Sequence, residues 1–136
     1  MNTVIEKQYK SKRNAVVKAE KLAEKITRKL AFDENERMDI AIAVTEAVNN
    51  ALEHGNRLVV DKLVTLRFEV TETYLRIVVR DEGGGFSMDG VADPLAPENL
   101  TKPNGRGLLI VDSLMDEVEV KPTPRGTEVI MLKRLN

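Results

Sequence analysis

The sequence predicts a two-layer α/β sandwich, in which helices cover one face of a mixed, mostly antiparallel sheet. Apolar residues recur at helical spacing through residues 15–51 and alternate with polar residues from residue 64 onward. Short turns join the alternating segments, which favours antiparallel neighbours. A helix with one apolar face must bury it, and the sheet offers the surface for this. The 136 residues fit a single domain spanning residues 1–136.

The first half of the chain predicts a short strand at residues 4–9 followed by two helices. Ser11 is placed to cap the first helix. Its apolar positions recur at helical spacing: Ala15, Ala19, Leu22, Ile26 and Leu30. Asp33 opens the second helix, and Glu36 stands three residues later, as in a capping box. Gly55 is a plausible stop for that helix.

The second half predicts two hairpins separated by a loop and a helix. The expected strands are residues 64–70, 75–80, 118–120 and 127–132, and the expected helix is residues 108–115. Residues 89–104 show no periodicity and contain three prolines. A loop of that length in a compact domain is usually functional or disordered.

Composition excludes several kinds of site. The chain has no cysteine, so a disulfide or a zinc–thiolate centre is impossible, and its single histidine excludes multi-histidine metal sites. A formal net charge of −1 gives no electrostatic reason to expect nucleic acid as a partner. The first residues lack the apolar run of a signal peptide, and no apolar stretch is long enough to span a membrane. We therefore expect a cytoplasmic protein.

Glu46 and Asn50 stand four residues apart on the second helix, so they project from the same side of it. Mg²⁺ usually takes one or two protein ligands and fills its other positions with water and phosphate oxygens. One Asn50 oxygen is therefore enough to anchor Mg²⁺-ATP, and Glu46 is placed to deprotonate or orient a nucleophile. The alternative is a solvated polar stripe. His54, one turn later, either touches the nucleotide or caps the helix end.

Asp81 continues the parity of the inward-facing residues of its strand, so we expect it to point toward the core. An ionised carboxylate only accepts hydrogen bonds, and the exocyclic amine of adenine is one donor that would satisfy it. The alternative is an Asp that caps the following turn. That turn contains Gly83, Gly84 and Gly85, which either admit a ligand close to the backbone or make a flexible connection.

A second glycine turn, Gly105-Arg106-Gly107, precedes the predicted helix at residues 108–115. A helix N-terminus offers free N–H groups to phosphates, and Arg106 and Lys102 add positive charge there. An ordinary loop-to-helix turn is the alternative. Thr127, after Gly126, shares the inward parity of its strand, and it either assists at the adenine near Asp81 or serves a structural role.

In order along the chain, these segments resemble the GHKL superfamily of ATP-binding domains. The N-box of that superfamily resembles residues 46–51, and its Asp-x-Gly-x-Gly motif resembles residues 81–85. Its second glycine motif resembles residues 105–107, and its late Gly-Thr resembles residues 126–127. The resemblance covers residues 33–132. Within the superfamily the chain is most similar to bacterial anti-sigma factors that are also serine protein kinases, whose N-box form matches residues 45–55.

The resemblance implies the Bergerat ATP-binding fold, with ATP and Mg²⁺ as cofactors. It implies Asn50 on Mg²⁺, Glu46 as general base, Asp81 on the adenine amine, and residues 89–104 as a lid over the phosphates. It further implies serine/threonine protein kinase activity, with a sigma factor and an STAS-type anti-sigma antagonist as partners. Many members are homodimers, so the same state is expected here.

Two other functions remain open from the sequence. One is a nucleotide-sensitive protein-binding switch without kinase activity, and retention of Glu46 argues against it because a pure binder needs no base. The other is a kinase of a signalling pathway without sigma factors. A sensor histidine kinase fits less well, since the only histidine, His54, lies inside the N-box.

Overall fold

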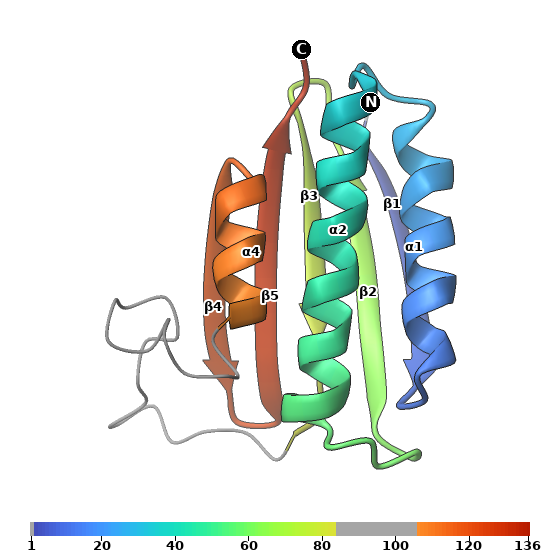
Figure 1. Ribbon diagram of the computed structural model, residues 1–136, viewed down its shortest axis with the longest axis vertical. Helices are drawn as coiled ribbons and strands as arrows, with labels where there is room; N and C mark the ends of the chain where they lie inside the picture. The colour runs from blue at the N-terminus through green and yellow to red at the C-terminus, as the bar shows by residue number, and fades with distance from the viewer. Residues whose placement is uncertain (1, 84–105) are drawn as a thin grey trace.

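The chain folds into one sheet with helices on a single face (Figure 1). The computed structural model describes residues 2–83 and 106–136. In chain order the elements are β1 (Thr3–Lys10), α1 (Asn14–Thr27), α2 (Glu34–Asn50), η1 (Ala51–Gly55), β2 (Leu63–Val70), β3 (Tyr74–Arg80), α4 (Arg106–Leu114), β4 (Glu117–Thr123) and β5 (Gly126–Arg134). The predicted two-layer sandwich is confirmed. The loop expected at residues 89–104 lies outside the described residues.

The sheet has the strand order β1-β2-β3-β5-β4. All four pairings among the described strands are antiparallel, so the expected mixture of parallel and antiparallel pairs is wrong for this part of the chain. The reason is local, because β2 and β3 form one hairpin and β4 and β5 form another. β3 and β5 then meet at the centre of the sheet, and Val79 pairs with Val129 there.

The core lies between the sheet and the helices α1, α2 and α4, with α2 in the middle of these (Figure 1). Inward-facing strand residues alternate with outward-facing ones, as the period-two pattern predicts. The largest fully buried side chains come from both layers: Phe68, Ile40, Leu52, Leu66, Leu75, Ile77 and Met131. α2 packs against both α1 and α4, so the helix that carries Glu46 and Asn50 has another helix on each side.

The two predicted helix starts have different outcomes. Asp33 accepts a hydrogen bond from the Glu36 N–H at 2.7 Å, and the Glu36 carboxylate accepts from the Asp33 N–H at 3.1 Å, so the capping box is confirmed. Ser11 as a helix cap is wrong, because α1 starts at Asn14 with no side-chain cap. Ser11 is instead buried, and its hydroxyl donates to the Lys62 carbonyl.

The face of the sheet away from the helices carries ion pairs rather than an apolar layer. Glu69 pairs with Arg67 at 2.7 Å and with Arg76 at 2.9 Å, and Arg80 pairs with Glu128 at 2.7 Å across β3 and β5. Such exposed pairs add little stability individually. They give this face a polar surface. The predicted site residues are therefore expected on the helical side of the sheet. None of the described helices combines the length and apolar character that a membrane crossing needs.

Candidate functional site

Asp81 directly follows β3 and is only 5% exposed, so the predicted inward orientation is confirmed. Its Oδ1 accepts from the Gly83 N–H at 3.0 Å and from the Thr127 N–H at 3.1 Å. Its own N–H donates to the Thr127 carbonyl at 3.0 Å. Oδ1 therefore caps the turn and ties β3 to β5, which is the structural role that sequence reasoning left open.

The second carboxylate oxygen of Asp81 has a different environment. Oδ2 accepts no hydrogen bond from the residues the structure describes. No fully buried side-chain oxygen or nitrogen in residues 2–83 and 106–136 lacks a partner, so Oδ2 retains access to solvent. One oxygen of Asp81 is thus used by the fold, and the other is available to a donor from outside.

Burial raises the pKa of Asp81 above its ordinary value, because the surroundings disfavour the charged form. The N–H groups of Gly83 and Thr127 and the positive charge of Lys62 act in the opposite direction and offset only part of this effect. A buried carboxylate with a raised pKa and one unused oxygen is typical of a binding site.

Three glycines allow the backbone to approach Asp81. A Cβ on Gly55 would overlap the Asp81 carboxylate, and a Cβ on Gly126 would overlap the Asp81 carbonyl. A Cβ on Gly83 would overlap the Gly55 carbonyl. The end of η1, the turn after β3 and the start of β5 therefore meet around one carboxylate. Gly55 was expected only to stop the helix, and its contact with Asp81 is a second reason for glycine there.

Glu46 and Asn50 lie on the last turns of α2, and both are half-buried. Neither side chain hydrogen-bonds to another residue in the described ranges, so their oxygens are available. A Cβ on Gly107 would lie 3.2 Å from Glu46 Oε2. The Glu46 carboxylate therefore faces the first turn of α4, where unpaired N–H groups make a site for anions.

α2 continues without a break into η1, a π-helical turn. Its closing bond runs from the Asn56 N–H to the Ala51 carbonyl at 2.8 Å. Such turns are frequent at functional sites. One continuous helix thus carries Glu46 next to α4, Asn50 at the junction and Gly55 against Asp81, which aligns three sequence motifs along one path.

The other predicted site residues are only partly placed. His54 is exposed on η1, and Thr127 is half-buried with its N–H on Asp81. Arg106 is the first residue of α4. Gly85, Lys102 and Gly105 lie outside the described residues, so the structure tests none of them. Glu53, on the same polar stripe, pairs with Arg13 at 2.7 Å and is thereby separated from the site.

Sequence reasoning missed Asn56, which is fully buried beside the site. Its side chain contacts residues that are distant in sequence, among them Ser11 and the Glu82 backbone. A polar residue directly after a predicted helix stop was the available signal. No role was predicted for Asn56, because its partners are not visible from periodicity.

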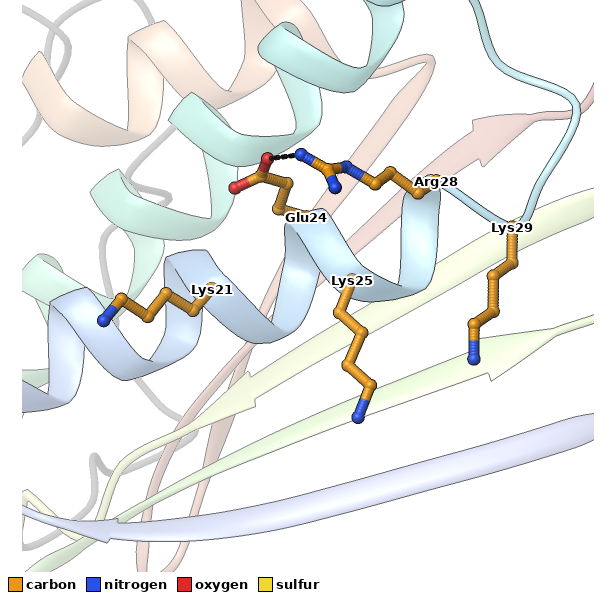
Figure 2. Close-up of a pocket in the computed structure, with 5 residues that line it drawn as sticks. All are labelled: Lys21, Glu24, Lys25, Arg28 and Lys29. Atoms are coloured by element: carbon orange, nitrogen blue, oxygen red, sulfur yellow. Dashed lines mark hydrogen bonds and ion pairs between the residues drawn. The ribbon is translucent and has the colours of Figure 1, made fainter.

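A shallow hollow on the outer side of α1 is a separate feature (Figure 2). It is lined by Lys21, Glu24, Lys25, Arg28 and Lys29. Glu24 pairs with Arg28 at 2.6 Å, and Figure 2 shows the three lysines extending away from this pair without converging on one point. All five residues come from α1 or the turn after it, so this hollow is a solvated basic surface apart from Asp81.

Comparison with known proteins gives the family. The model of the histidine kinase-like ATPase domain family matches residues 9–133. The chain belongs to this family. This ATPase domain is 34% identical over 118 residues to the serine-protein kinase RsbW of Bacillus subtilis. The match covers 82% of this chain and 72% of that protein. It is 33% identical over 102 residues to the anti-sigma F factor of Clostridium novyi, covering 71% and 70%.

Solved structures support the fold of this ATPase domain. The RsbU and RsbW domains of a Mycobacterium tuberculosis protein align with a TM-score of 0.72 and 19% identity over 98% of this chain, which spans about a third (32%) of the solved chain. A histidine kinase domain from the blue-light-activated kinase of Erythrobacter litoralis aligns with a TM-score of 0.60 and 22% identity, covering 90% of this chain and 60% of that one. The resemblance drawn from the four motifs is confirmed.

Proposed function

We propose that this chain is an ATP-dependent serine/threonine protein kinase that is also an anti-sigma regulatory factor. Its relatives named serine-protein kinase and anti-sigma F factor support this activity. The observation that carries the proposal is the path along α2 and η1. It places the Glu46 carboxylate at the first turn of α4 and brings Gly55 against the free oxygen side of Asp81. Phosphoryl transfer needs groups at both ends of a nucleotide, and this path supplies them.

The adenine end of the proposed site is Asp81. Oδ2 has no partner in the described part of the chain and retains solvent access, so it is free to accept from the exocyclic amine of adenine. Thr127 is placed to assist, because its N–H holds Oδ1 in position. The proposal assigns Gly83 and Gly85 to nucleotide binding beside the base, because the Asp-x-Gly-x-Gly resemblance implies this role.

The phosphate end of the proposed site is the N-terminus of α4. Gly107 lies in its first turn, where N–H groups and the positive end of the helix dipole favour phosphate. The proposal also assigns Lys102, Gly105 and Arg106 to the phosphates and residues 89–104 to a lid, because the family resemblance implies these roles. His54 on η1 completes the nucleotide contacts.

The metal and the base of the proposed site lie on α2. No group of three or more His, Asp or Glu residues within residues 2–83 and 106–136 is arranged to hold a metal ion. The donor set fits Mg²⁺ that takes Asn50 as one ligand and phosphate oxygens and water as the rest. Bound Mg²⁺-ATP supplies the phosphoryl group. Glu46 would accept the proton of the attacking serine hydroxyl as that oxygen takes the γ-phosphoryl group and ADP leaves.

The partners of the proposed kinase are a sigma factor and an STAS-type anti-sigma antagonist whose serine receives the phosphate. The names of the relatives support the first, and the family resemblance supports the second. The same resemblance supports a homodimer, and the cytoplasmic location expected from the sequence stays part of the proposal. Neither nucleic acid nor a membrane surface belongs to the proposal.

Substitutions on α2 separate the metal ligand from the base. Asn50→Ala should abolish both Mg²⁺-ATP binding and phosphate transfer. Glu46→Ala should leave ATP affinity within about threefold but lower transfer by on the order of 10²- to 10⁴-fold, the usual contribution of a general base. The measurements are calorimetric titration with Mg²⁺-ATP and transfer of labelled γ-phosphate to an antagonist protein.

Asn49→Ala is the matched control, because Asn49 is the neighbouring half-buried amide on α2. It should bind ATP and transfer phosphate like the wild type. Normal transfer by both Glu46→Ala and Asn50→Ala would contradict the assignment. ATP binding and nucleotide-dependent partner binding without any transfer by the wild type would show a switch instead of a kinase.

A further inference from the structure

Asn56 is the most completely satisfied polar side chain near the nucleotide motifs, and the proposed ATP site does not use it. It is fully buried, at 0% exposure, and directly follows η1. Its Nδ2 donates to Ser11 Oγ at 2.9 Å and to the Leu63 carbonyl at 3.0 Å. Its Oδ1 accepts from the Glu82 N–H at 2.6 Å. The carboxamide thus uses both of its donor hydrogens and its acceptor oxygen.

These hydrogen bonds join Asn56 to three segments that lie far apart in the sequence. Ser11 lies between β1 and α1, Leu63 begins β2, and Glu82 is the residue after Asp81. Glu82 is held twice, because its carboxylate also accepts from the Leu63 N–H. The peptide that leads out of Asp81 therefore has its position set from the side of η1.

Asn56 is also adjacent in sequence to Gly55, whose backbone lies against the Asp81 carboxylate. Gly55, the preceding residue, leaves no room for a Cβ beside the Asp81 carboxylate, and its carbonyl lies where a Cβ of Gly83 would stand. A shift of Glu82 away from Asn56 would therefore open the spacing between η1 and the turn that Asp81 Oδ1 caps. The Gly55 backbone lies next to Oδ2, so that spacing sets the space around the free oxygen.

We propose that Asn56 is a positioning residue for the nucleotide site, which sets the direction of the Asp81 carboxylate through its bond to the Glu82 N–H. This inference rests on the proposed ATP site. Asn56 does not touch the nucleotide. It acts through Asp81, and the Leu63 carbonyl holds the Asn56 amide from the opposite side, with Ser11 as an outer contact.

The test compares Asn56→Ala with Ser11→Ala and with the wild type. All three are titrated with Mg²⁺-ATP by calorimetry at a low temperature, after circular dichroism shows that each is fully folded. Asn56→Ala deletes the acceptor of the Glu82 N–H and should weaken ATP binding about tenfold. Ser11→Ala removes only the outer contact and should stay within about threefold. In the kinase assay, Asn56→Ala should raise KM for ATP and leave kcat within about twofold.

A double-mutant cycle with Asp81→Asn separates positioning from a general loss of structure. If Asn56 acts through Asp81, then Asn56→Ala should change ATP affinity by less than about twofold in the Asp81→Asn background. A loss of about tenfold in both backgrounds would overturn the inference, and so would wild-type affinity in folded Asn56→Ala. Failure of the wild type to bind ATP would instead overturn the proposed function.

Amide hydrogen exchange of the wild type tests the same bond without a substitution. The Glu82 amide should exchange slowly before any nucleotide is added, because the bond to Asn56 is already formed. Exchange of the Glu82 amide as fast as that of exposed loop amides would overturn the inference even if Asn56→Ala did not fold.

Discussion

The two oxygens of the Asp81 carboxylate have different roles, one in the fold and one in the proposed site. Oδ1 accepts from the Gly83 and Thr127 N–H groups, and Oδ2 stays open. Sequence parity predicted the inward orientation, since alternation along β3 sets it locally. It could not predict the division, because Thr127 lies 46 residues away and reaches Asp81 only after β3 and β5 pair.

The free energy of unfolding should depend on pH through the Asp81 carboxylate. Its pKa is raised in the folded state by burial, so the folded state holds this proton more tightly than the unfolded state does. The stabilisation from the protonated form is complete below the unfolded pKa and is lost as pH rises through the folded pKa. Asp81→Asn has no such proton, so wild type should gain stability relative to Asp81→Asn as pH falls.

Urea denaturation of both proteins at about pH 7 and about pH 4.5 measures this difference. At the higher pH, Asp81→Asn should be at least as stable as wild type, because the amide keeps an acceptor for Gly83 and Thr127 without the buried charge. A wild type that loses stability relative to Asp81→Asn on acidification would show a lowered pKa and contradict this account.

Asn56 and Ser11 mark the limit of residue-level prediction. Ser11 was expected to cap α1, because its residue type and place before an apolar helical pattern favour a cap. It is buried at 1% exposure, and its hydroxyl joins Asn56 and Lys62. Hydrogen bonds between residues about 50 positions apart leave no periodic signal, so they cannot be predicted from the sequence pattern.

At the scale of elements, the sequence predicts α2 but not η1, the turn that continues it. The capping box and the apolar face are both local, and both are confirmed. The π-helical turn η1 was not predicted, because one residue more per turn does not alter the apolar spacing over so short a segment. That turn is what brings Gly55 and Asn56 to Asp81 and Glu82.

Removal of the capping box should affect stability without affecting the site. Asp33→Ala deletes the acceptor of the Glu36 N–H and should lower the free energy of unfolding by about 1 kcal/mol. ATP affinity should be unchanged, because Asp33 and Asn50 lie at opposite ends of α2 (Figure 1). Thermal denaturation and calorimetry measure the two effects.

Asn35→Ala, an exposed position in the same turn, is the control for Asp33→Ala and should change stability little. A loss of ATP affinity in folded Asp33→Ala would show that the start of α2 is coupled to its end, which the account does not include.

At the scale of the whole molecule, the fold brings together the described parts of four weak motifs, with Gly107 facing Glu46 and with Gly55 and Gly126 against Asp81. Element order and hairpins predicted the sandwich, since antiparallel neighbours follow from short turns. The central pairing of β3 with β5 was not derivable from local pattern, yet it places Thr127 at Asp81. The family resemblance supplied what local physics did not.

Charge is unevenly distributed over the molecule. Residues 7–29 contain nine basic and two acidic side chains, a net of +7, so the rest of the chain carries −8 within a total of −1. The helix α1 and the end of β1 hold this basic region, which includes the hollow in Figure 2. The formal net charge near zero is therefore the sum of a basic region and an acidic remainder.

The central claim is that the free oxygen of Asp81 recognises adenine. Calorimetric titration of the wild type and Asp81→Asn with Mg²⁺-ATP tests it most directly, with Asp61→Asn as an exposed control carboxylate. Asn presents donors to the adenine amine in place of an acceptor, so Asp81→Asn should bind ATP at least about tenfold more weakly while melting like a folded protein. Wild-type affinity in folded Asp81→Asn would contradict the account and remove Asp81 from the site.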